Sequence, residues 1–257
     1  MQRRAARLRQ ETRNWALHSI LDENRPTMRD IVLKYLLRPI AMLFLEPILL
    51  LITLYLSFIY AVLYLFFEAY PVAFGEVRHW DNEGVASLPF LGILVGVLLG
   101  VAYVIFITKT RFTRKMQEQG RVVPEERLFP MIPASILLPA GLFWFGWTSH
   151  PSVHWAPQVI AGVPIGFGIL VIFMQGLNYL VDVYLMFANS AIAGNTIVRS
   201  ALGGSFPLFA VQMYHKLGVD WASSLLAFLS IAMVPIPVLF YIFGAKIRSW
   251  SRYSPKL

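Results

Sequence analysis

Long stretches without a charged side chain follow one another along the chain after residue 38. A helix crosses a bilayer core about 30 Å thick with about 20 apolar residues, so each such stretch is a candidate span. The sequence therefore predicts six membrane-spanning helices. Their approximate ranges are 40–67, 86–108, 129–148, 157–180, 186–213 and 221–245.

The composition agrees with this pattern. Hydrophobic residues make up 57% of the chain and charged residues 14%, against about 45–50% and about 25% in soluble domains. We therefore expect an all-α, multi-pass protein whose main surroundings are the lipid bilayer. The net charge of +8 does not predict nucleic-acid binding, because the basic residues stand in blocks beside apolar runs. Cysteine is absent, which excludes disulfides and thiolate metal sites.

Lysine and arginine predict the orientation of the chain. Nineteen of them lie in residues 1–38, in the loop 109–127 and in the tail 246–257, whereas Arg78 and Lys216 lie on the opposite flanks. Because cytoplasmic flanks retain positive charge, both ends are predicted to be cytoplasmic. We expect the plasma membrane as the location.

Residues 1–38 are predicted to be a basic cytoplasmic segment and not a signal peptide, since they lack an apolar core. Within this segment, Thr27–Asp30 resembles a capping signal ahead of an apolar stretch, which favours a short amphipathic helix before the first span. The alternative, a solvated basic segment attracted to anionic lipid, is compatible with that helix.

Arg199 places a permanent cation near the middle of the fifth predicted helix. A charge at that depth is costly in lipid, so Arg199 should face the bundle interior or water and pair with an anion or backbone carbonyls. Asn195 lies one turn earlier on the same face. Two interpretations stay open and are compatible: a residue of a substrate cavity, and a structural link between two helices.

The residues after Arg199 predict a break in the same helix. Pro207 has no N–H to donate to the carbonyl of Gly203, and its ring crowds that carbonyl. The helix is therefore expected to kink or loosen at Gly203 and Gly204. A simple packing kink is the alternative.

Two acidic residues near helix ends are candidates for coupling or gating. Glu46 lies within the first span, where burial favours a protonated carboxyl suited to proton coupling. An interfacial pairing of Glu46 with Arg38 or a basic loop residue is slightly favoured. Asp182, one turn after Asn178, is either a helix-end carboxylate that meets the basic loop or part of a gate.

Glycines at four-residue spacing predict close contact between helices. They are Gly92, Gly96 and Gly100 in the second span and Gly162 and Gly166 in the fourth. Small residues at this spacing let a neighbouring backbone approach. Packing is therefore the leading interpretation, and sliding of helices extends it.

Neither a metal site nor an enzyme is predicted. His150 and His154 have the spacing of metal ligands, but Pro151 lies between them and no acidic cluster is nearby. The chain has no nucleophile elbow, phosphate-binding loop or dinucleotide glycine motif. We expect no cofactor.

Several segments resemble the carboxy-terminal half of fungal major facilitator superfamily exporters. The closest branch is the drug:proton antiporters, which include polyamine and multidrug transporters. The resemblance runs in order from about Arg38 to Arg252. The segments are RPIAMLFLEP, YLFFEAYPVAF, VPEERLFPM, GLFWFGWTS, NYLVDVY, NTIVRSALGGSFPLFAVQMY, LGVDWASSLLAF and MVPIPVLF.

This resemblance implies that the six spans are helices seven to twelve of such a transporter, built as a three-plus-three inverted repeat around a shared central cavity. The loop sequence PEERL resembles a second copy of the superfamily's gating motif, in which Glu125 and Arg127 are candidates; positive-inside anchoring alone is the alternative. The implied candidates for the cavity wall are Tyr60, Gln175, Asn178, Asn195, Arg199 and Phe206.

The resemblance also implies a function and a partner. We expect alternating access that exports amphipathic or cationic small molecules, such as drugs or polyamines, in exchange for protons. The first six-helix half of such a transporter is not in this chain, so the expected partner is that half or a second copy. A truncated product or gene-model fragment, inactive in transport, is the second hypothesis.

Overall fold

The computed structural model describes residues 8, 10–13, 36–80 and 82–254, and every regular element formed by these residues is helical. The expected amphipathic helix after Thr27 lies outside the described residues. The helices are α4 (Arg38–Leu45), α5 (Pro47–Tyr70), α6 (Glu83–Ser87), α7 (Phe90–Ile107), α8 (Thr113–Gln119), α9 (Met131–Trp147), α10 (Trp155–Tyr184), α11 (Ala188–Ser205), α12 (Pro207–Met233) and α13 (Pro235–Ser249). Short π and 3-10 segments are Pro71–Val77, Thr108–Phe112, Pro124–Arg127 and Leu185–Phe187.

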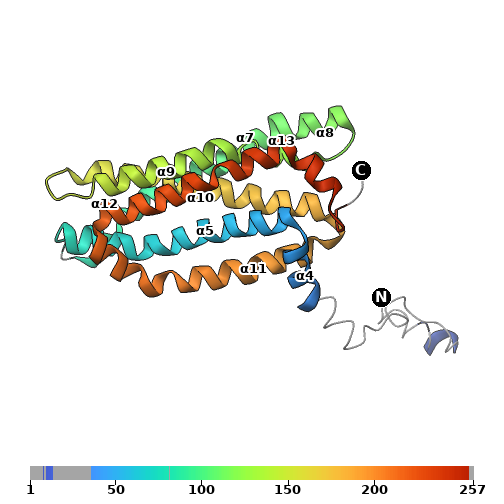
Figure 1. Cartoon of the computed structure of the whole chain (residues 1–257), viewed down its shortest axis with the longest axis horizontal. Helices are drawn as coiled ribbons and strands as arrows, with labels where there is room; N and C mark the ends of the chain where they lie inside the picture. The colour runs from blue at the N-terminus through green and yellow to red at the C-terminus, as the bar shows by residue number, and fades with distance from the viewer. Residues whose placement is uncertain (1–7, 9, 14–35, 81, 255–257) are drawn as a thin grey trace.

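The described residues form six passes of an elongated bundle (Figure 1). Five continuous runs are long and apolar enough to cross a membrane, and the run Trp155–Ser205 holds two passes because the chain reverses at the turn Leu185–Phe187. The fifth pass continues from α11 into α12 as far as Gly218. There the backbone is left-handed, with φ 77° and ψ 161°, which favours glycine. The sixth pass combines the rest of α12 with α13.

The first pass is not continuous, in contrast to the expected helix over 40–67. Glu46 separates α4 from α5 and has an extended backbone, with φ −111° and ψ 105°. The following Pro47 disfavours the helical conformation for the residue before it, which accounts for the break. The helix ends later than expected, because π-helical turns over Pro71–Val77 extend it.

The expected break in the fifth helix is located one turn further on. Gly203 and Gly204 both lie within α11, which runs to Ser205. The interruption is at Phe206, directly before Pro207, and the backbone of Phe206 keeps helical angles. Pro207 therefore interrupts the hydrogen-bond pattern without a large bend at this point.

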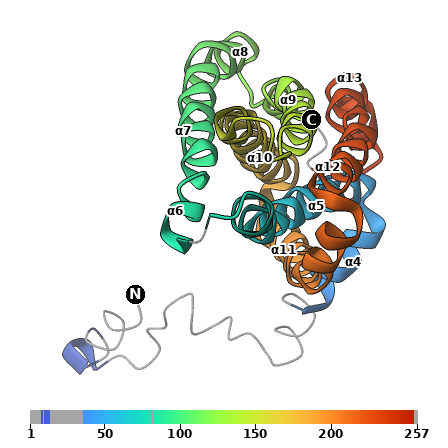
Figure 2. The same ribbon diagram turned by 90° about the vertical axis from the view of Figure 1, so that its left-hand side faces the viewer.

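Helices α5 and α10 form the centre of the bundle, as the end-on view shows (Figure 2). Helix α7 packs mainly against α10, and α11 packs mainly against α5, while α9 lies between α10 and α12. The second pass thus pairs with the fourth, and the fifth pairs with the first. This reciprocal pairing is the relation that two repeats of three helices produce.

The glycines predicted to mediate packing do so between α7 and α10. A Cβ atom on Gly96 would overlap the carbonyl oxygen of Val163, and one on Gly166 would overlap the carbonyl oxygen of Ile93. Gly92 is equally close to the carbonyl of Val159. The two backbones are therefore in direct contact, and the packing interpretation is confirmed.

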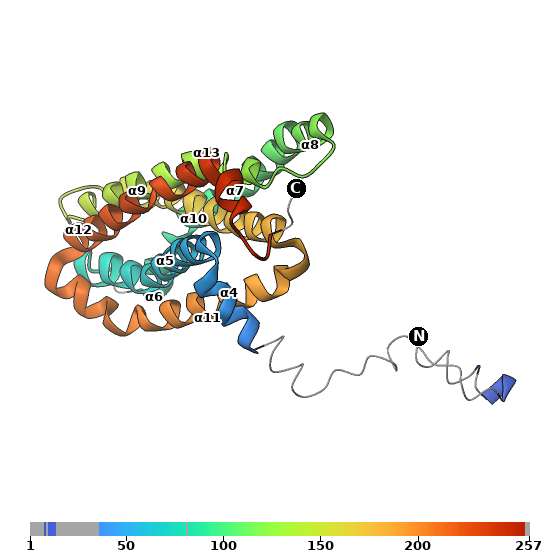
Figure 3. The same cartoon turned by 45° about the vertical axis from the view of Figure 1, so that its right-hand side comes forward.

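The two ends of the bundle differ in chemistry. The end at which α4 begins and α13 finishes carries Arg38, Arg127 and Arg248, and is called the charged end below. In Figure 3, α4 lies against α11 at this end. The opposite end is called the tryptophan end and carries paired rings. The pairs are Trp80 with Trp155 and Trp147 with Trp221.

Candidate functional site

Arg199 lies on α11, eleven residues after the helix begins at Ala188, which corresponds to about 16 Å along the axis. Its guanidinium carbon is 4.8 Å from the ring centroid of Tyr60 and 4.9 Å from that of Phe173. The cation is thus held against the π faces of α5 and α10, a favourable contact when water is excluded. The expected anion or carbonyl partner is replaced by two aromatic rings.

Among the described residues no carboxylate forms an ion pair with Arg199. Its Nε atom is buried and has no hydrogen-bond partner. A buried guanidinium N–H without an acceptor is costly. The side chain is therefore positively charged and incompletely satisfied at membrane depth.

One of the two rings that contact Arg199 packs directly against a glycine of α11. A Cβ atom on Gly203 would lie 2.7 Å from Cδ1 of Tyr60, so only glycine leaves room for this ring against α11. The hydroxyl of Tyr60 lies 3.1 Å from that of Tyr64. Gly203 thus shapes the site by making space for Tyr60.

An apolar cavity of about 190 Å³ lies beside the two rings that contact Arg199, although Arg199 itself is not among its lining residues. Tyr60 and Phe173, the two rings that contact Arg199, line it together with aliphatic side chains of α5, α7 and α10. A permanent cation and an apolar space therefore share two walls.

The other predicted cavity residues are distributed around this site. Asn195 is fully buried and donates from Nδ2 to Oγ1 of Thr53 at 3.3 Å, while its Oδ1 has no partner. Gln175 is buried with an unpaired Oε1. Asn178 and Phe206 are half-buried. The structure brings only Tyr60 of this set against Arg199.

The coupling and gating candidates meet at the charged end. Arg127 donates from Nε to Asp182 at 2.8 Å, so Asp182 does meet the loop before α9. Glu125 of the same loop lies 3.3 Å from an amino group of Arg248. The neighbouring Glu126 pairs with Arg111 at 2.8 Å. The segment Pro124–Arg127 is thereby linked to the ends of the second, fourth and sixth passes.

The pair Arg127–Asp182 is expected to couple by about 1 to 2 kcal/mol in a double-mutant cycle of Arg127→Ala and Asp182→Ala, measured by thermal unfolding of the purified protein. The side chains are only 18% and 14% exposed, so water screens the pair weakly. The control is Arg114–Glu118, 78% and 48% exposed, which should couple by about 0.3 to 0.5 kcal/mol. Equal coupling in the two cycles would contradict a buried link.

Glu46 is 1% exposed, and within the described residues it forms no ion pair with Arg38 or a basic loop residue, in contrast to the favoured interpretation. It accepts from the hydroxyl of Tyr184 at 3.3 Å and from the backbone N–H of Arg252 at 2.9 Å. The break before Pro47 aims the carboxyl at these donors. Glu46 therefore ties the start of the bundle to its last described residues.

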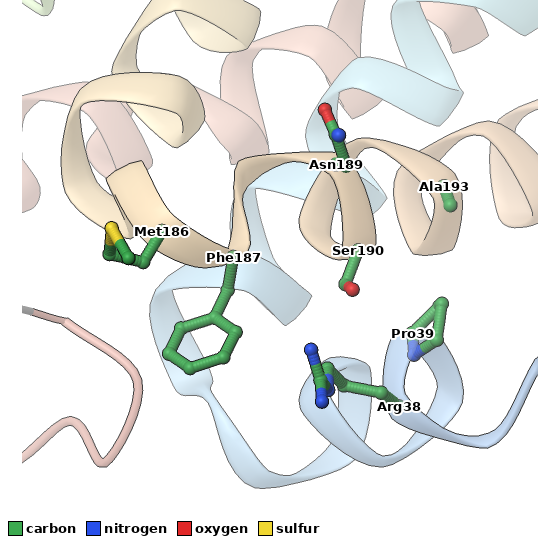
Figure 4. Close-up of a pocket in the computed structure, with 7 residues that line it drawn as sticks. All are labelled: Arg38, Pro39, Met186, Phe187, Asn189, Ser190 and Ala193. Atoms are coloured by element: carbon green, nitrogen blue, oxygen red, sulfur yellow. The ribbon is translucent and has the colours of Figure 1, made fainter. Parts of the chain in front are cut away.

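Arg38 instead lines a separate cavity of about 220 Å³ at the charged end (Figure 4). Its guanidinium lies 5.3 Å from the ring of Phe187, in the turn before α11. The ring of Tyr253 packs edge-on against the same Phe187 ring, with 5.3 Å between the two ring centroids. The turn between the fourth and fifth passes is thus contacted both by the start of α4 and by the segment after α13.

Arg78 is a structural residue that the sequence analysis did not identify. Its guanidinium donates to Oε1 of Gln158 and to the carbonyls of Val153 and Thr148, at 2.7 to 2.9 Å. Burial lowers the pKa of this guanidinium from its ordinary value. Its position at the tryptophan end, away from the basic blocks, could have indicated this role. Helix ends leave backbone carbonyls without an N–H partner, and an arginine can donate to them.

The two histidines between α9 and α10 have local roles. His150 lies 2.7 Å from the hydroxyl of Ser152, and His154 accepts the N–H of Ala156 at the start of α10. Across the part of the chain that the structure describes, no group of three or more histidine or acidic side chains is arranged to hold a metal.

No protein-family model and no solved structure matches the chain. It is 68% identical over its whole length to a citrinin biosynthesis cluster transporter of the major facilitator superfamily from Monascus ruber, of which it covers 51%. It is 63% identical to an ascochitine biosynthesis cluster transporter of the same superfamily from Didymella fabae, of which it covers 50%. A multidrug transporter of the superfamily from Aspergillus fumigatus is 46% identical, with 42% covered.

The chain thus spans about half the length of these relatives. Its six passes pair as two groups of three, and the relatives are fungal transporters of one superfamily. The chain belongs to the transporters of the major facilitator superfamily.

Proposed function

We propose that this chain works as one half of a transporter that exports amphipathic small molecules by alternating access in exchange for protons, at the plasma membrane and with both ends of the chain in the cytoplasm. The observation that supports this best is the site at Arg199. A cation that pairs with none of the described carboxylates, on rings that line an apolar cavity, suits binding of an amphipathic molecule better than it suits helix packing alone.

The proposed partner is a six-helix amino-terminal half or a second copy of the chain. Helix α7 supports a partner, because only 17% of an apolar stretch of 18 residues within Gly84–Gln119 is buried inside the bundle. Lipid covers part of such a helix. A second bundle would cover the remainder and close the wall that contains Arg199.

The relatives support the kind of cargo. Two are named for clusters that make citrinin and ascochitine, and one is named a multidrug transporter. Polyamines fit the site less well, because the fixed charge of Arg199 repels cations. For proton coupling we propose Glu46, because it is a buried carboxyl whose partners are the hydroxyl of Tyr184 and the backbone N–H of Arg252.

Expression with the unmatched half of the Monascus ruber relative tests this function. Inside-out vesicles that contain both polypeptides should accumulate neutral or charged aromatic probes when a proton gradient is imposed, and a protonophore should abolish the accumulation. Vesicles with either polypeptide alone serve as the control.

Accumulation by this chain alone would favour the homodimer. No accumulation of any probe by a folded, co-purifying pair would contradict the proposal and favour an inactive membrane protein. Accumulation that resists the protonophore would contradict proton coupling only.

A further inference from the structure

We infer that the site at Arg199 selects compact aromatic anions, with the carboxylate on the guanidinium and the ring in the adjoining cavity. This inference rests on the proposed function and names the substrate class for the same site. Three features of the site support it: its charge, the shape of the cavity and the depth of both in the bilayer.

The charge of the site requires an anion. Arg199 is a permanent cation, its buried Nε has no acceptor, and none of the described carboxylates pairs with it. Guanidinium binds carboxylates through two parallel N–H···O bonds, and such bonds are strong where water is excluded. A carboxylate ligand would supply the missing acceptor. An ammonium ligand would leave Nε unsatisfied and add repulsion.

The cavity requires an aromatic or similarly flat apolar body. Its volume is about 190 Å³, and the side chains that line it are aliphatic or aromatic. An apolar cavity of about 150 Å³ is sufficient to hold benzene. The rings of Tyr60 and Phe173 lie 6.1 Å apart with planes inclined by 23°, so they offer nearly parallel faces beside the guanidinium. One ring with small substituents fits this space.

The depth of the site excludes a lipid headgroup as the anion. Arg199 lies about 16 Å along α11 from its beginning at Ala188. Headgroup phosphates lie near the ends of the spanning helices and not at this depth. The ligand is therefore a free organic acid.

Binding of two matched probes to the purified chain in nanodiscs of zwitterionic lipid tests the inference. The probes are 4-fluorophenylacetate and 4-fluorobenzylammonium, which share a ring and a fluorine signal for NMR but carry opposite charge. We expect the acid to bind at least about tenfold more tightly than the amine. Arg199→Gln should remove this preference, whereas Lys216→Gln, at an exposed cation, should keep it.

A second variant covers the case in which Arg199→Gln does not fold. Val97 of α7 lines the cavity, so Val97→Phe should fill the space and weaken binding of the acid by about tenfold while Arg199 stays in place. Equal affinities for the two probes, tighter binding of the amine, or binding of the acid that Val97→Phe leaves unchanged would each overturn the inference.

The binding assay does not depend on transport. Vesicles that accumulate neutral probes, combined with nanodiscs that show no preference for the acid, would overturn the substrate class and leave the proposed function intact. If the chain prefers the acid but its vesicles accumulate no probe, the proposed function would be overturned and the preference of the site for anions would stand.

Discussion

Arg199→Ala is expected to lower transport by the two-half protein at least about tenfold, whereas Lys216→Ala should leave transport close to the wild-type rate. Arg199 holds its charge against the rings of Tyr60 and Phe173 at membrane depth, and Lys216 is exposed near the tryptophan end. The measurement is the initial rate of probe accumulation in vesicles, normalised to the amount of folded protein.

The thermal unfolding of the same two variants separates function from folding. Burial of a guanidinium without an ion pair is unfavourable, so Arg199→Ala should leave the unfolding temperature unchanged or raise it. Transport that is equal in the two variants would show that Arg199 is not part of the substrate path. A large fall in unfolding temperature would favour the alternative, in which Arg199 links helices.

The second large effect concerns the contact between α7 and α10. Gly96→Ala is expected to destabilise the bundle by about 3 kcal/mol or more, because the added methyl overlaps the carbonyl of Val163 and comes within 2.8 Å of the backbone nitrogen of Phe167. Backbone atoms cannot rotate away as a side chain can, so the helices must separate. Tryptophan fluorescence during thermal unfolding in detergent measures the change.

Gly204→Ala is the matched control on α11. Gly204 is exposed, and an added Cβ would meet nothing within 4 Å. Alanine favours a helix over glycine by about 0.5 to 1 kcal/mol, so this variant should be unchanged or slightly more stable. A similar loss of stability in both variants would show that α7 and α10 do not touch through their backbones.

The sequence predicted the fold well because the signal for a spanning helix is long and redundant. Loss of one residue from a 20-residue apolar stretch changes little, so six passes follow from counting. The glycine spacing similarly predicted close backbone contact for the second and the fourth spans, but not that they contact each other. The break at Glu46 was missed because the stretch was treated as one continuous apolar run, although Pro47 signals it locally.

The site was less predictable. Helical spacing places Asn195 and Arg199 on one face of α11 but does not say which helix faces them. The contacts of Arg199 with α5 and α10 depend on how three helices cross, and the room for Tyr60 depends on Gly203. Glu46 shows the same limit, since its partner Arg252 is 206 residues away. Contacts between distant segments need the assembled fold.

The bonds that gather at the charged end have a consequence for how this protein moves. The loop before α9 is tied to the ends of the second, fourth and sixth passes, and Glu46 ties the first pass to residue 252. A bundle fastened in this way should rotate as a rigid body. In the proposed transporter, the hinge for opening and closing then belongs at the boundary of this bundle with the proposed partner, and distances measured between labels inside the bundle should stay constant through the cycle.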